Sequence, residues 1–265
     1  MKTLKNSLLI LAVAIFGFTA TTFGQARVQV IHNSADEAAE TVDVWLDNTL
    51  LLDDFMFRTA SPFVDAPAGV DLSVIVALPS SSGPTDGVVT TIPIGQLADM
   101  GKYVVFANGV LDPTQFAANP EARGIGFELL VKDMAQEEST SDNVEFFVLH
   151  GATDAPAVDV IARDVATLVD NAAYTDMTGY IPVPAASYIL DVTPAEDNET
   201  IVASFTADLS GLGGGSAAVF ASGFLTPSAN QDGAAFGIFA ALANGTVVEF
   251  PAYMPEAAAP TPSMN

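Results

Sequence analysis

The chain of 265 residues has no cysteine, only two histidines and one tryptophan, and eight basic residues against 32 acidic ones. The lack of cysteine excludes disulfide bonds, thiolate metal sites and a lipid-modified cysteine. The shortage of Lys and Arg excludes nucleic acid and anionic membrane surfaces as partners, because both require clustered positive charge. The net charge of −24 indicates a solvated, self-repelling surface, with adaptation to high salt as the alternative. Each domain must therefore be held together by a hydrophobic core.

Long apolar runs are also scarce, and the one at residues 8–16 follows the basic start Lys2 and Lys5. This pattern, followed by small residues, predicts a signal peptide over residues 1–24, although a cut after Ala26 also fits. A membrane anchor is the alternative, but a spanning helix needs about 20 apolar residues. The run breaks at Gly17 and Thr19. We therefore expect a secreted or cell-surface protein that is not inserted in a membrane once the signal is cleaved.

The chain after the predicted signal peptide is rich in short runs of Val, Ile and Phe, separated by Pro, Gly, Asp and Ser. These features predict strands and turns throughout. The expected strands are residues 27–31, 42–46, 72–78, 88–94, 102–107, 144–149, 158–162, 188–192, 201–205, 217–221, 237–242 and 246–250. Seven or eight short strands in about 115 residues favour a β-sandwich over the alternative, an antiparallel barrel.

Two passages of the sequence occur twice. Residues 104–113 return as residues 218–227, a shift of 114 positions. A period of this size is that of a whole domain, which indicates tandem duplication. The sequence therefore predicts two tandem immunoglobulin-like antiparallel β-sandwich domains, residues 25–138 and 139–253, followed by a Pro- and Ala-rich tail, 254–265. The polar linker 136–142 marks a boundary that we expect few contacts to cross.

The second repeated passage starts from a histidine. His32, Asp36 and Val-Asp-Val at 42–44 return as His150, Asp154 and Val-Asp-Val at 158–160. With the Pro-Ala-Ala-Ser-Tyr turn at 184–188 and the Val-Phe-Ala-x-Gly strand, these motifs resemble domain-of-unknown-function family 4397 over nearly the whole mature chain, twice. The first copy departs at residues 37–41, which lengthen its loop by two residues. The resemblance implies an exported bacterial protein with tandem copies and no established catalytic role.

The repeated His and Asp residues are the best candidates for ligand contact. His32 with Asp36, and His150 with Asp154, stand in loops that leave the first strand of each copy. One interpretation is a His–Asp pair that binds a ligand or metal. The other, which we favour, is that imidazole and carboxylate tie the loop to backbone groups.

No metal or cofactor is expected. One His per domain is too few for zinc, which takes three or four ligands. Calcium suits carboxylates better, and Asp53–Asp54 and Asp36–Glu37 are the densest clusters of the first copy. We favour solvated surface acids, and we expect Asp53–Asp54 to have no duplicate in the second copy. Trp45 has Ile161 as its counterpart, which indicates a core role rather than a sugar-stacking platform.

Enzyme signatures fail on their spacing. Residues 95–102 have five residues between the glycines of a phosphate loop where four are required, residues 211–216 miss the dinucleotide pattern, and there is no Gly-x-Ser-x-Gly. We predict a secreted or cell-surface, non-enzymatic, monomeric protein that is a binding or structural module for an unknown extracellular protein or glycan. The alternative is an extracellular carboxylate-dependent hydrolase that acts on glycans at the domain junction.

Overall fold

The computed structural model describes residues 24–255, and nearly all regular structure in this part is β-strand. The predicted signal peptide, apart from Gly24, and the tail from residue 256 onward lie outside the described residues. Within residues 24–255, no helix has the length and apolar character that crossing a membrane requires. The described part of the chain has three short 3-10 helices: η1 (Glu37–Ala39), η2 (Pro113–Gln115) and η3 (Pro227–Ala229).

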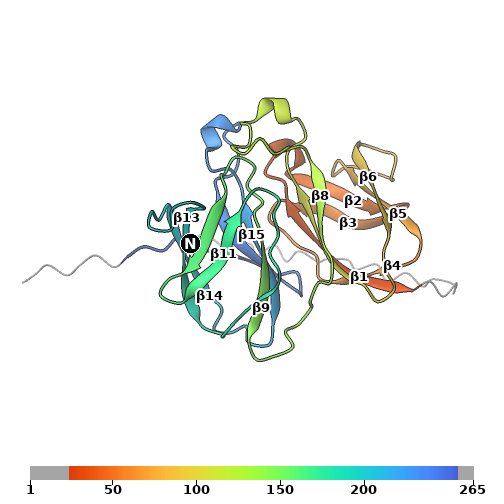
Figure 1. Ribbon diagram of the computed structural model, residues 1–265. Helices are drawn as coiled ribbons and strands as arrows, with labels where there is room; N and C mark the ends of the chain where they lie inside the picture. The colour runs from red at the N-terminus through yellow and green to blue at the C-terminus, as the bar shows by residue number, and fades with distance from the viewer. Residues whose placement is uncertain (1–23, 256–265) are drawn as a thin grey trace, which may run out of the picture.

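Each half of the chain forms two stacked sheets, so the β-sandwich prediction is confirmed (Figure 1). The first sandwich has sheets of order β4-β1-β7-β8 and β3-β2-β5-β6. Its strands are β1 (Gln25–Asn33), β2 (Thr41–Leu46), β3 (Thr49–Met56), β4 (Val64–Pro67), β5 (Asp71–Ala77), β6 (Val88–Gln96), β7 (Lys102–Asn108) and β8 (Glu128–Lys132).

The second sandwich repeats this order as β12-β9-β15-β16-β17 and β11-β10-β13-β14, with β17 as an additional strand. Its strands are β9 (Val144–Leu149), β10 (Val158–Ala162), β11 (Ala166–Ala172), β12 (Ile181–Val183), β13 (Ser187–Pro194), β14 (Ala203–Asp208), β15 (Ser216–Ser222), β16 (Gly237–Leu242) and β17 (Val247–Phe250). Strand pairing is antiparallel except for β1 with β7 and β9 with β15, which are parallel.

Every strand expected from the sequence is present, and five further strands were not expected: β3, β4, β8, β11 and β12. Charge interrupts the apolar pattern of β3 and β11, as Asp53 and Asp54 do inside β3, and β8 is a short apolar run with a charged residue at each end. The other two, β4 and β12, span only four and three residues. Short or charged strands give a weak signal because neighbouring strands, rather than their own composition, hold them in place.

Residues 24–255 contain four hydrophobic clusters, and the last two join the two sandwiches; the fourth and smallest consists of Val110, Ile125, Tyr174 and Phe224. One core lies between the sheets of each sandwich. The third lies between the β1-β7-β8 face of the first sandwich and the β9-β15-β16 face of the second, where the rings of Phe106 and Phe220 are 5.7 Å apart. The expectation that few contacts cross the domain boundary is therefore wrong. These central strands are apolar on both faces, so each face needs a cover.

Candidate functional site

The two histidines lie at the ends of equivalent strands, and both are buried. His32 ends the core-forming part of β1, where its Nε2 lies 2.7 Å from the Ala39 carbonyl and its Nδ1 accepts a hydrogen bond from the Ser34 N–H. These partners describe a neutral imidazole with its proton on Nε2. The ring of Phe55 is 5.8 Å away. Burial lowers the pKa of His32 to about 4.

His150 occupies the same place after β9. Its Nε2 lies 3.0 Å from the carbonyl of Pro156, and burial lowers its pKa as well. Its Nδ1 is buried and has no hydrogen-bond partner among the described residues. Both imidazoles are thus held against a carbonyl of their own loop.

The two aspartates bind backbone N–H groups of a second repeated segment. Asp36 accepts from the N–H of Ala38 at 2.9 Å and from that of Leu111 at 2.8 Å. Asp154 accepts from the N–H groups of Leu225 and Thr226, each at 2.8 Å, and from the side-chain amide of Asn230. The carboxylates therefore join the loop after the first strand of each copy to the segment that follows β7 or β15.

These contacts are those that the structural interpretation of the motif predicts. In neither copy does the histidine bind its aspartate, since the imidazole contacts a carbonyl and the carboxylate contacts N–H groups. The ligand-contact role of His32, Asp36, His150 and Asp154 stays a prediction. In the first copy, the longer loop contains the three-residue helix η1, and Asp36 caps its N-terminus.

The two histidine loops meet at the junction of the sandwiches. Asn33 follows His32, and its side-chain amide donates to the carbonyl of Ala221 in the second sandwich at 3.1 Å. Gly151 stands at the equivalent position after His150, where a Cβ would lie 2.2 Å from the Asn33 Nδ2 atom. The duplicated position therefore carries a side chain in one copy and none in the other, so that the two loops fit against each other.

Buried neutral His32 makes stability depend on pH. The folded-state pKa of about 4 lies below the ordinary histidine value of 6.5, so below pH 6.5 the unfolded chain takes up the proton first. This contribution to stability is complete above pH 6.5 and is lost progressively as the pH falls toward 4. Between pH 7 and pH 5 it amounts to about 2 kcal/mol.

We expect urea titrations at pH 7 and pH 5 to show this term as a difference between the wild-type chain and His32→Gln. The variant is less stable at pH 7, but its loss of unfolding free energy between the two pH values is smaller by about 2 kcal/mol. His150→Gln serves as the matched variant and should reduce the loss in the same direction. If His32→Gln keeps the full wild-type pH dependence, His32 is not the buried neutral group described here.

Two arginines that were not predicted from the sequence connect the first sandwich to the second. Arg58 extends from the first sandwich to the second, where its guanidinium donates to the Ser222 and Ala235 carbonyls at 3.2 and 2.6 Å. It also lies 4.3 Å from the centre of the Phe239 ring. Arg123, in the loop before β8, forms an ion pair of 2.7 Å with Asp176 of the second sandwich.

The remaining basic residues of the first sandwich contact the linker or the second sandwich. Arg27 and Lys102 both form ion pairs with Glu137 of the linker, at 2.8 and 3.3 Å. These cations lower the pKa of Glu137, chiefly through the hydrogen bond from Arg27. Lys132 lies 5.7 Å from the ring of Phe147 in β9. The scarcity of cations in so acidic a chain was the available signal, because among residues 24–255 every basic side chain except Arg163 contacts the linker or the other sandwich.

Replacing Arg58 tests this role. Arg58→Lys keeps the positive charge but loses the planar donors and the ring contact, so we expect unfolding free energy to fall by roughly 2 kcal/mol. Thermal or urea unfolding measures the loss. Arg163→Lys, whose ion pair with Asp191 lies within the second sandwich, is the matched control for the junction. A loss for Arg58→Lys no larger than about 0.5 kcal/mol would contradict this assignment.

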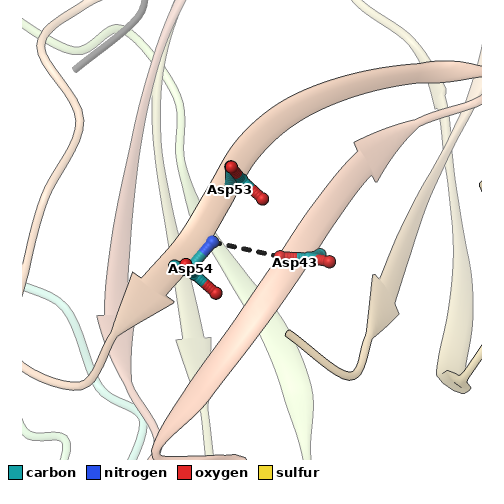
Figure 2. Close-up of side chains that lie close together, drawn as sticks. All are labelled: Asp43, Asp53 and Asp54. Carbon is teal, nitrogen blue, oxygen red and sulfur yellow. Dashed lines mark hydrogen bonds between the residues drawn. The ribbon is translucent and has the colours of Figure 1, made fainter. Parts of the chain in front are cut away.

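Three acidic side chains gather where β2 and β3 pair (Figure 2). Asp43 is buried, and it accepts from the Asp54 N–H at 3.0 Å and from the Ser81 hydroxyl. Asp53 and Asp54 are exposed, and the pKa of Asp53 is raised, mainly by desolvation and then by the charges of Asp43 and Asp54. Among the described residues, these carboxylates are the set close enough together to hold a cation.

The statement that Asp53–Asp54 lacks a duplicate is wrong. In the second copy, Asp159 accepts from the Asn171 N–H as Asp43 does from Asp54. Both Asp54 and Asn171 have positive φ, at 50° and 52°, beside a shift of strand register. The central Asp of each Val-Asp-Val motif therefore holds a β-bulge in the next strand. This structural task explains why the motif recurs, although one acid of the cluster is an amide in the second copy.

Trp45 is buried, as expected, but it does not fill the space between the sheets. It alternates with the core residues Val42 and Val44 of β2, and so lies on the other face with Asp43. Its indole N–H donates to the Ser81 hydroxyl at 3.0 Å. The loop between β5 and β6 thus covers it.

The comparisons with known proteins bear on the second sandwich. No curated protein matches the chain. A family model described as Domain of unknown function (DUF4397) matches residues 128–232. The matched stretch begins in β8 and contains the His150 loop, Asp154 and β15, and it represents one copy rather than two. Over residues 128–232 this chain is therefore similar to the DUF4397 domain family, as its motifs predicted.

Proposed function

We propose that this chain is an exported, non-enzymatic protein that acts at the cell surface or in the medium as a binding or structural module. Its partner would be an extracellular protein or a glycan, and the chain would act as a monomer. We also propose that the first sandwich is a second, diverged copy of the DUF4397 domain, because its strand order repeats that of the second.

The observation that carries this proposal is the use of the repeated polar residues. Each histidine contacts a backbone carbonyl, Asp36 and Asp154 accept from backbone N–H groups, and Asp43 and Asp159 hold β-bulges. The centre of the junction, where the hydrolase alternative would place its carboxylates, is occupied by aromatic rings such as Phe106, Phe147 and Phe220. Because the repeated polar residues hold the fold together, they support the proposal that the protein acts through its surfaces.

The export part of the proposal predicts a defined N-terminus. Strand β1 begins at Gln25, and Ala26 is fully buried against its partner Ala66 in β4. A cut after Gly24 leaves this strand whole, whereas a cut after Ala26 would remove two of its residues. We expect N-terminal sequencing of the exported protein to begin at Gln25. A mature chain that retains residues 1–24 would contradict the signal-peptide assignment.

Binding and turnover are tested together. The mature chain is immobilised and exposed to cell-surface extract and to a glycan array, and the retained molecules are analysed by mass spectrometry before and after long incubation. We expect retention without any change of mass. New reducing ends or cleaved fragments, absent with heat-unfolded protein, would contradict the non-enzymatic proposal.

A further inference from the structure

The two sandwiches differ at one edge, and the second shows how that edge is closed. Strand β17 pairs antiparallel with β16, opposing Phe250 to Ile238. The chain then crosses to the other sheet, where the Pro251 carbonyl accepts from Thr206 and the Tyr253 N–H donates to Ser204, both at 2.8 Å. Phe250 is buried in the core of the sandwich. A single segment, residues 247–253, thus covers the gap between β16 and β14.

The first sandwich has no counterpart of this segment within residues 24–255. Strands β8 and β6 are the last strands of their sheets. After β8 the chain turns toward the second sandwich, and Ala135 joins the core that the two sandwiches share. The edge between β6 and β8 therefore stays open.

One consequence is an exposed core position. Val131 pairs with Val105 of β7 as Ala240 pairs with Val219 of β15, so Val131 and Ala240 are equivalent. Ala240 lies opposite Val248 of β17 and is 2% exposed, whereas Val131 is 49% exposed although it faces the interior of its sandwich.

The second consequence is a cavity. The interior of the first sandwich contains an apolar cavity of about 160 Å³, with Leu129 and Val131 of β8 and Ile94 of β6 in its wall. The corresponding cavity of the second sandwich is about 40 Å³. The side chains of the paired first strands largely offset each other, because Val28 stands where the second copy has Phe146 and Tyr103 stands where it has Ala217. Among the described residues, the first sandwich has no counterpart of Phe250, because no strand pairs with the outer edge of β8. A cavity of about 150 Å³ is large enough to take a benzene ring.

The rim of the opening is unusual for this chain. All nine residues of β6 are uncharged in a protein of net charge −24, and none of its side chains is fully buried. Exposed edge strands are normally protected by charge, by shortness or by a covering segment. Strand β6 instead carries Pro93 and two shifts of register against β5, features that also hinder edge pairing, so β8 is the more open of the two edges.

We infer that the open β6–β8 edge of the first sandwich binds an extended peptide strand of a partner protein, which adds antiparallel to β8 and inserts an aromatic side chain into the cavity. This inference rests on the proposed function and names the partner's chemistry: alternating apolar residues with one aromatic side chain opposite Leu129. Basic rather than acidic flanks suit the charge of −24. Main-chain hydrogen bonds to β8 give affinity, and the cavity gives specificity.

A peptide from the second sandwich can be used to test binding at the open edge of the first. A capped peptide of residues 245–253 carries the closing segment of the second sandwich, with Phe250 in the register that the cavity requires. We expect it to bind the full mature chain, measured by calorimetry, and to protect the backbone amides of β8 and β6 from hydrogen exchange. Replacing its Phe by Ala should weaken binding at least about tenfold, and replacing its Glu by Lys should strengthen binding at low salt.

Variants of the protein locate the site. Val131→Asp places a charge at the rim and should weaken peptide binding at least about tenfold. Val165→Asp, at another exposed valine, is the matched control and should leave binding unchanged. Val131 is 49% exposed and Val165 is 65% exposed, and circular dichroism and urea unfolding verify that both variants are folded before binding is compared.

Several outcomes overturn the inference. They are no peptide binding at about 1 mM, protection of β16 and β14 instead of β8 and β6, or uptake of benzene into the cavity without any peptide binding. Such a failure leaves the proposed function standing as long as the chain retains cell-surface ligands without turnover. Conversely, turnover of a glycan or protein ligand would contradict the non-enzymatic proposal but would not change the result of the peptide-binding experiment.

Discussion

Phe220→Ala is expected to lower the unfolding free energy by about 3–5 kcal/mol, the range for removing a buried phenylalanine from a core. Phe220 is fully buried, and its ring lies 5.7 Å from Phe106 of the first sandwich and 5.9 Å from Phe239 of its own sheet. Backbone lies on both sides of this core, so the site cannot collapse onto the void. The loss includes both the transfer of the ring and the cavity that it leaves.

The position of Phe220 also predicts how the chain unfolds. Because the two sandwiches share this core, we expect the wild-type chain to unfold in one cooperative transition. Phe220→Ala should weaken the coupling and separate the transition into two. Phe205→Ala is the matched control, since Phe205 belongs to the core inside the second sandwich. It should cost a similar free energy, but it should leave the junction intact and destabilise the second sandwich first.

Urea unfolding followed by fluorescence and by circular dichroism measures both effects. Coincident transitions in the wild type and separated ones in Phe220→Ala would support a rigid pair of sandwiches. Two transitions in the wild type, or a loss for Phe220→Ala below about 1 kcal/mol, would contradict the shared core.

The sequence contains a signal for the core that the two sandwiches share. Residues 104–107 and 218–221 are apolar without interruption, unlike the alternating Val42-Asp43-Val44. Alternation indicates one buried face, and a continuous run indicates two. The repeated passage that revealed the duplication thus also specified that its strands are covered on both sides. The sequence did not predict which element covers the second face, because a run of apolar residues does not specify what packs against it.

The candidate site was predicted in its parts but not in its assembly. The sequence pairs His32 with Asp36 by their spacing, yet Asp36 binds Leu111, 75 residues further along the chain. Both partners of this contact belong to repeated passages, which marks them as structural. Their contact depends on the parallel pairing of β1 with β7, which spacing along the chain does not reveal. The bulge held by Asp43 is hidden for a similar reason, since it depends on strand β3.

The second large effect is expected at Asp154. Its carboxylate is 9% exposed and accepts three hydrogen bonds, from Leu225 N–H, Thr226 N–H and the Asn230 amide. Asp154→Ala leaves these donors without their acceptor. An orphaned buried donor costs about 1–3 kcal/mol, so we expect a total loss of roughly 3 kcal/mol. Asp154→Asn keeps one acceptor oxygen and should lose less.

Asp36→Ala is the matched variant from the first copy, with two hydrogen bonds in place of three. If the role is structural, Asp154→Ala should lower the unfolding free energy more than Asp36→Ala does. The binding of any retained ligand should then change only when the protein unfolds. A ligand-contact role predicts the reverse: Asp154→Ala would stay folded within about 1 kcal/mol of wild type while its binding is lost. Since a carboxylate that already accepts three donors has little capacity left for a ligand, the measured split between stability and binding decides between the two roles of the repeated His–Asp motif.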